Sequence, residues 1–352
     1  MNRKQIIILS GYSIIHGLID LCCAMLVLST LLINGFSVRD SFICVITYNV
    51  IAFGLQAPLG ALVDKLRAPK ESAFMGCILV LISFFVFNNP FLLVILLGLG
   101  NAFFHVGGGS ISLNFNQNKA TAPGVFVGPG ALGLTIGVLI GKSGLFIAWP
   151  FVILLIISCI FIYFGKIPQI DYERKPIKQK IGYFELVIIL ILSSISIRAL
   201  YGSIAIFAWK ADIFLLSLLT LAVVSGKIFG GFIADRFGWI KTSVFALLIS
   251  APLLAFFQES PLLIIIGMFL FQITMPITVT ALSNMLLGRS ATAFGLTVLA
   301  LLIGAIPSYL GLQDFFNNQW IHLLIIVLSA SFLLISFKFL YNYFNKEKKI
   351  SL

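Results

Sequence analysis

Ionisable residues inside long apolar stretches are the first clue to chemistry in this chain of 352 residues. Five of them stand out: His16, Asp20, His105, Arg198 and Lys227. A charge at the centre of a bilayer costs roughly 2.5–3.5 kcal/mol even on permissive scales, so such residues usually serve a function. This group predicts chemistry on an ion or solute inside a membrane.

His16 and Asp20 are one helical turn apart, so their side chains share one face of a predicted helix. A carboxylate beside an imidazole is suited to carry a proton, because burial and the partner together tune the proton affinity of both groups. We therefore predict that Asp20, with His16, couples proton movement to function. A hydrogen-bonded pair that only orients the helix is the alternative.

Two bases in the second half of the chain, Arg198 and Lys227, predict contacts to substrate. They favour an anionic compound, since a carboxylate or a phosphonate accepts charge-assisted hydrogen bonds. For Lys227 the alternative is a long stem that reaches the membrane interface. His105, Gln56 and Asn101 are further predicted substrate contacts, and a purely structural role for each stays open.

Composition predicts the surroundings of these residues. Hydrophobic residues make up 60% of the chain, charged residues 10%, and the mean hydropathy is +1.11. Apolar runs of about 20 residues, each long enough to cross roughly 30 Å of hydrocarbon as a helix, predict an all-α polytopic membrane protein. Twelve spans are expected at residues 6–32, 41–63, 70–88, 91–114, 122–141, 145–165, 184–209, 213–234, 241–257, 261–287, 291–311 and 321–343.

A short pattern, Gly-x-x-x-Asp-(Lys/Arg), occurs twice. The first copy is Gly60, Asp64 and Lys65, and the second copy is Gly231, Asp235 and Arg236. An offset near half the chain length indicates a duplication, with six-helix halves at 1–165 and 183–352 and a basic cytoplasmic linker at 166–182. Both copies end a predicted span, so we predict gates in which the carboxylates accept hydrogen bonds from neighbouring bases and helix N-termini.

Charge asymmetry predicts the orientation in the membrane. With both termini inside, 18 of the 23 Lys and Arg residues fall on cytoplasmic segments, which is the positive-inside pattern. We predict a multi-pass protein of the plasma membrane that works as a monomer. The net charge of +11 then reflects topology rather than nucleic-acid binding.

Asp20 and Arg198 occur at nearly equal depth in the first helix of each predicted half. At 1.5 Å per residue, each is about 21 Å from the cytoplasmic end of its helix. We expect both to face one central cavity near the membrane midplane, where such duplicated carriers bind solute, and to pair in one state.

The twelve spans, the repeated motif and the basic central loop resemble the major facilitator superfamily over the whole chain. Three stretches are similar to its fosmidomycin-resistance efflux branch: His16-Gly-Leu-Ile-Asp20, Gln56-Ala-Pro-Leu-Gly60 and Gly98-Leu-Gly-Asn-Ala-Phe-Phe-His105. Arg198 also resembles an arginine that the branch carries in span 7. The resemblance implies a proton-driven antiporter, although residues 106–109 replace the Pro and Glu that usually follow the span-4 histidine.

The leading prediction is a secondary active transporter that works by alternating access and couples protons to the efflux of a small organic anion or drug. An uptake carrier or a uniporter for a small metabolite stays open, with protons or another ion as partner. So does a non-transporting membrane receptor. The chain shows no phosphate-binding glycine loop, metal cluster or catalytic triad, so no enzyme, cofactor or metal is expected.

Overall fold

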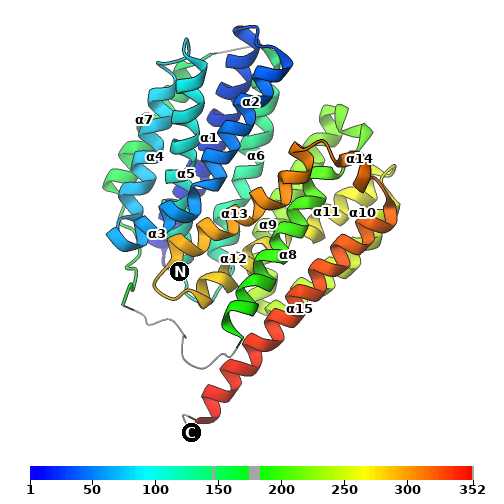
Figure 1. The fold of residues 1–352 in the computed structure, drawn as a ribbon. Coiled ribbons are helices and arrows are strands. Elements are labelled where there is room, and N and C mark those ends of the chain that lie inside the picture. Colours follow the sequence, from blue (N-terminus) through cyan, green and yellow to red (C-terminus); the bar gives the residue numbers. More distant parts are fainter. Residues whose placement is uncertain (145–146, 174–182, 351–352) are drawn as a thin grey trace. The chain divides into compact units, whose positions relative to one another are not determined.

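The structure, a computed structural model, describes residues 1–144, 147–173 and 183–350, with the side chains of 341–350 left aside. Over these ranges the chain is helical and contains no strand, which confirms the predicted all-α class (Figure 1). Among the described residues, ten segments are long and apolar enough to cross a membrane. Two more predicted spans are shorter helices, α4 (Pro69–Ser83) and α7 (Trp149–Phe164). All twelve predicted spans thus correspond to helical segments.

Two predicted spans extend too far. The third, at 70–88, stops at Ser83 because the chain turns before Pro90, where Asn89 caps the next helix and accepts the N–H of Leu92 at 3.1 Å. The seventh, at 184–209, stops at Ile204, after which the backbone becomes extended. A hydropathy pattern locates an apolar run but does not show where the helix ends.

The chain forms two compact units. The first comprises Met1–Gln117, Ala122–Tyr172 and Arg289–Leu299. Besides α4 and α7, it contains α1 (Arg3–Ile33), α2 (Val38–Asn49), the π-helix η1 (Val50–Gly54), α3 (Gln56–Leu66), α5 (Pro90–Leu113), α6 (Thr121–Ser143) and the start of α13 (Ser290–Tyr309). Within it, α1 packs against α5 and α7.

The second unit comprises Asn118–Thr121, Glu173–Gly288 and Ala300–Leu352. It contains α8 (Phe184–Ile204), η2 (Ala208–Ala211), α9 (Ile213–Phe237), α10 (Trp239–Phe256), α11 (Pro261–Gln272), α12 (Thr274–Met285), the rest of α13, α14 (Gln313–Phe316) and α15 (Gln319–Ile350). Here α15 packs against α8 and α10. Residues 174–182 of the predicted linker lie outside the described residues, and the boundaries proposed around it remain predictions.

Glycines bring α6 directly onto α1. A side chain at Gly133 would overlap the backbone of Gly17, and side chains at Gly137 and Gly141 would meet Leu21 and Met25. Glycines four residues apart lie on one face of a helix, and such a face allows two backbones to approach closely in a membrane. This contact fixes the part of α1 that carries His16 and Asp20.

Candidate functional site

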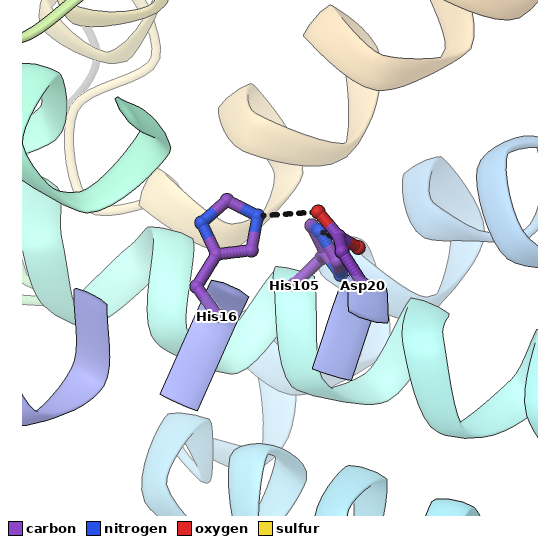
Figure 2. A group of neighbouring side chains, drawn as sticks. All are labelled: His16, Asp20 and His105. Carbon is purple, nitrogen blue, oxygen red and sulfur yellow. Dashed lines mark ion pairs between the residues drawn. The ribbon is translucent and has the colours of Figure 1, made fainter. Parts of the chain in front are cut away.

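Three ionisable side chains meet inside the first unit (Figure 2). His16 Nε2 lies 3.3 Å from Asp20 Oδ2, and His105 Nε2 lies 3.4 Å from Asp20 Oδ1. The side chain of Asp20 is 18% exposed, whereas both imidazoles are buried. We call these three residues the Asp20 cluster.

Backbone carbonyls hold both imidazoles in place. His16 Nδ1 lies 2.7 Å from the carbonyl oxygen of Phe126, and His105 Nδ1 lies 2.8 Å from that of Asn101. Asn101 also donates its side-chain N–H to Asp20 Oδ1 at 3.1 Å. The carboxylate therefore has three polar neighbours, drawn from α1 and α5.

Helical spacing explains most of this geometry. His16 and Asp20 are four residues apart on α1, and Asn101 and His105 are four residues apart on α5, so each pair shares a helix face. The approach of α6 supplies the rest. Phe126, one turn before Pro129 and Gly130 in α6, offers its carbonyl to His16.

Gly130 of α6 covers the cluster. A Cβ at this position would lie 2.6 Å from both Asp20 Oδ2 and His16 Nε2. Only a glycine lets the α6 backbone pass so close to the two charged groups. No local pattern distinguishes this glycine from the others among the 30 in the chain.

The donor atoms of His16, Asp20 and His105 all lie within 4.8 Å of one another, a set that could also hold a metal ion. Imidazoles whose other nitrogen bonds to a backbone carbonyl are found at metal sites as well as at proton sites. The expectation that the chain uses no metal stays a prediction.

A second buried ionic centre lies in the second unit. Arg198 of α8 is 6% exposed and donates Nε–H to the carbonyl of Ser194 at 3.3 Å. Its terminal nitrogens donate to the hydroxyls of Thr274 and, at 3.1 Å, Thr278, both on α12. All these acceptors are neutral, and Arg198 forms no ion pair with a described residue of its own unit.

The hydroxyl groups of the two threonines are oriented to accept hydrogen bonds from Arg198. Thr274 donates its hydroxyl hydrogen to the Phe271 carbonyl at 2.9 Å, and Thr278 donates to the carbonyl of Thr274 or Met275 at 3.1 Å. Their lone pairs remain for the guanidinium. Neither threonine was predicted as a site residue. The available signal was that they lie one helical turn apart, with Pro276 between them, beside a break between α11 and α12.

Gln56 and Lys227 occupy equivalent positions of the two sequence halves when Gly60 is aligned with Gly231. Gln56, fully buried at the start of α3, donates to the Ala52 carbonyl at 2.8 Å, and its Oε1 has no hydrogen-bond partner among the described atoms. Lys227 is half-buried on α9. Their roles as substrate contacts remain predictions.

The repeated aspartates cap helices. Asp64 accepts the N–H of Ala291 at 3.1 Å and, through its other oxygen, the N–H and hydroxyl of Thr292, each at 2.7 Å. These partners open α13, and that part of α13 belongs to the first unit. A carboxylate at a helix N-terminus satisfies free N–H groups and complements the helix dipole.

Asp235 repeats the arrangement in the second unit. It accepts the N–H of Ala120 at 2.9 Å and the N–H and hydroxyl of Thr121 at 3.0 and 2.6 Å. In the duplication, Ala120 and Thr121 are the counterparts of the two residues that Asp64 caps. Trp239 Nε1 also donates to Asp235 at 3.2 Å.

The glycines and the bases of the repeated motif have different surroundings. Gly60 and Gly231 leave room for the capped helices, because a Cβ would meet the Ala291 and Ala120 backbones. Lys65 and Arg236 are exposed, and Arg236 lies over the ring of Phe237. The gating role assigned to all six residues remains a prediction.

Three solved structures that resemble this chain are described as transporters. A crystal structure of the Escherichia coli fucose:proton symporter FucP matches 96% of this chain and 99% of its own at 13% identity, with a TM-score of 0.70. A structure of FucP in the outward conformation, described as a major facilitator superfamily transporter, matches at 94% and 99%, with 13% identity and a TM-score of 0.64.

The human organic anion transporter MFSD10 matches 94% of this chain and 99% of its own, with 13% identity and a TM-score of 0.66. The sequence matches no protein-family model and no curated protein. At this identity the similarity shows the fold, which is the major facilitator fold of twelve helices predicted from the sequence.

Proposed function

We propose that this protein is a secondary active transporter that works by alternating access and exports a small organic anion in exchange for protons. The observation that carries the proposal is the presence of one buried ionic centre in each unit, acidic in the first and basic in the second. Buried ionisable groups in membrane helices mark ion and substrate pathways.

The two centres occur at equivalent helix pairs. Asp20 on α1 meets α5, and Arg198 on α8 meets α12. The alignment of the two halves places Asn101 of α5 on Gln272, next to the break between α11 and α12. The first helix of one half thus carries a buried acid and the first helix of the other half a buried base, which suits a carrier that handles a cation and an anion.

In the proposed cycle, Asp20 with His16 carries the proton. A carboxylate buried in a membrane is costly without a counter-charge, so the gain or loss of a proton at the pair changes the energy of whichever conformation buries it. Arg198 binds the anion. Three of its five N–H groups are used by Ser194, Thr274 and Thr278, which leaves two for a bidentate carboxylate or phosphonate.

Lys227 and Gln56 are proposed as further substrate contacts, Lys227 through its charge and Gln56 through its unsatisfied oxygen. His105 and Asn101 touch Asp20, so we place them on the proton side of the cycle. Asp64 and Asp235 are proposed as gates that hold the starts of α13 and α6 and release them when the transporter changes state.

Named activities of the similar structures support transport of small solutes: one is a fucose:proton symporter and another an organic anion transporter. Export, rather than uptake, rests on the resemblance to the fosmidomycin-resistance branch. A monomer in the plasma membrane with cytoplasmic termini is part of the proposal and rests on the Lys and Arg asymmetry.

Proteoliposomes containing a pH-sensitive dye test the proposal. Addition of a transported anion from a panel of carboxylates and phosphonates is expected to drive proton movement, and Asp20→Asn is expected to abolish that movement. Asp40→Asn is the matched control, because Asp40 is an exposed acid whose partner is Ser37 at the start of α2.

Three results would contradict the proposal. Anion flux that is independent of pH indicates a uniporter, and proton and anion movement in the same direction indicates uptake by symport. If circular dichroism shows that the protein is folded and no anion of the panel is transported, the result favours a receptor.

A further inference from the structure

The proton positions in the Asp20 cluster follow from the chemistry of its partners. A backbone carbonyl oxygen has no hydrogen to donate. His16 Nδ1 and His105 Nδ1 each face such an oxygen, at 2.7 and 2.8 Å, so each Nδ1 must carry the hydrogen of that bond. In the neutral form of either ring, Nε2 then carries a lone pair and no hydrogen.

Both Nε2 atoms face the carboxylate of Asp20, at 3.3 and 3.4 Å. A lone pair directed at an anion is repulsive unless a proton lies between them. Oδ1 accepts one hydrogen from Asn101, whereas among the described residues only His16 Nε2 is placed to supply a hydrogen to Oδ2. The cluster thus contains two N···O lines, each with a place for one proton.

The charge of the cluster follows from the number of protons on these lines. With none, two neutral imidazoles face a carboxylate and the net charge is −1. One proton gives zero, and two protons give two imidazolium ions on one carboxylate, with net charge +1. The two lines are nearly equal in length, at 3.3 and 3.4 Å, so each has room for one proton.

Among the described residues of the first unit, no other charged group supplies the missing hydrogens. On α1, the thiol of Cys23 lies near Asp20 but bonds to the Leu97 carbonyl at 3.8 Å. On α2, the hydroxyl of Tyr48 is paired with the thiol of Cys23. From α6 the nearest group is Gly130, which has no side chain.

We propose that His105 is a proton-carrying residue equal to His16, and that the cluster takes up two protons, one on each Nε2, in the arrangement seen here. This deepens the proposed function and rests on it for the number of protons exchanged per anion. Each imidazole gains its proton at Nε2 and returns to the Nδ1–H neutral form when it releases it.

Proton release is then linked to movement of the helices. Without its protons the cluster places two lone pairs against an anion, so among its polar contacts between α1 and α5 only the hydrogen bond from Asn101 to Asp20 stays attractive.

The first test needs no transport. In spectra of the purified protein with ¹⁵N-labelled histidine, the signals lost in His16→Gln and His105→Gln identify the two rings. At high pH both are expected as Nδ1–H tautomers, and on acidification both are expected to gain a proton at Nε2. His322→Gln is the control, since His322 is a buried histidine of the second unit.

An Nε2–H tautomer at high pH in either ring, or a ring that never gains a second proton, would overturn the assignment. So would a spectrum that changes when divalent cations are removed by a chelator, because the cation on the two lines would then be a metal.

The second test measures stoichiometry from the pH gradient that just balances an anion gradient in proteoliposomes. Two protons per anion are expected for the wild type and for His322→Gln, and one for His105→Gln or His16→Gln. A ratio that does not change in His105→Gln refutes the inference while leaving the proposed exchange intact. If the spectra are as expected but no protons move with the anion, the proposed function fails and the assignment of the protons stands.

Discussion

At the residue scale, the two centres solve the problem of a buried charge in different ways. Asp20 is surrounded by groups that can gain or lose protons, so its environment can change charge. Arg198 is surrounded by hydroxyl and carbonyl oxygens that cannot, so its charge is permanent. A group of fixed charge is suited to bind a counter-ion, and a group of variable charge is suited to couple that binding to protons.

Arg198→Lys is expected to abolish high-affinity anion binding, even though the charge is kept. A lysine ammonium cannot reach three acceptors in a plane and still offer two parallel N–H groups to the ligand. We expect at least a tenfold rise in the KM for the anion, about 1.4 kcal/mol, with the proton titration of the histidine spectra unchanged. An unchanged KM would remove Arg198 from the substrate site.

Thr278→Val is expected to have a smaller effect of the same kind. Loss of one hydrogen bond to a charged group costs about 1.5–3 kcal/mol where the group stays buried, but the anion can restore part of it. We expect a KM increase of about three- to tenfold. Thr280→Val is the matched control, since Thr280 is a buried threonine of the same helix that bonds to the Pro276 carbonyl. Equal effects of the two changes would contradict the role of Thr278.

Contacts between residues close in the sequence could be predicted, whereas contacts between distant helices could not. The pairing of His16 with Asp20 follows from helical spacing and is present in the structure. The contact of His105 with Asp20 joins two helices that are far apart in the sequence, and no local pattern predicts which face of α5 meets α1. The threonines around Arg198 were missed because hydroxyls are common in membrane helices and carry no signal of their own.

At the element scale, α6 serves the acidic centre with its backbone. It offers the Phe126 carbonyl to His16 and a bare Cα to the charged pair, on either side of Pro129. This explains why a helix without an ionisable side chain near the centre still determines its geometry.

Gly130→Ala is expected to uncouple the cluster. The added methyl would lie 2.6 Å from two polar atoms, so either the pair separates or α6 moves away from α1. Such overpacking costs roughly 1–3 kcal/mol, and we expect a lower Tm together with loss of proton-linked transport. In Gly202→Ala, the control, the methyl meets nothing within 4 Å. A Gly130→Ala protein with normal coupling would show that the α6 contact is not needed.

Each aspartate caps a different helix, so loss of either cap is expected to affect only the start of the helix that it caps. Asp64→Asn loses the charge and one acceptor oxygen at the start of α13, and Asp235→Asn loses the same at the start of α6; loss of a cap costs about 0.5–2 kcal/mol. Hydrogen exchange is therefore expected to quicken up to about 30-fold at residues 291–294 in the first variant and at 120–123 in the second. The same peptides responding in both variants would contradict separate caps.

At the scale of the whole molecule, the duplication was the most informative feature of the sequence. It predicted two halves of six helices, and the fold agrees because apolar runs in a membrane have few alternatives to helices. The exchange of short pieces, by which Arg289–Leu299 joins the first unit and Asn118–Thr121 the second, could not be predicted. It depends on which helix N-termini the repeated aspartates contact, and these are tertiary contacts.

The last prediction concerns the two centres as parts of one cycle. If protons and anion are exchanged by the same conformational change, defects at Asp20 and Arg198 must combine non-additively, because a carrier already stalled at one step loses little from a second block. We expect Asp20→Asn with Arg198→Ala to transport no worse than the poorer single variant. Pairing Asp20→Asn with Lys338→Ala, an exposed base on α15, should give additive effects. Strict additivity for Asp20 and Arg198, measured as initial rates in proteoliposomes, would mean that the two centres serve separate activities.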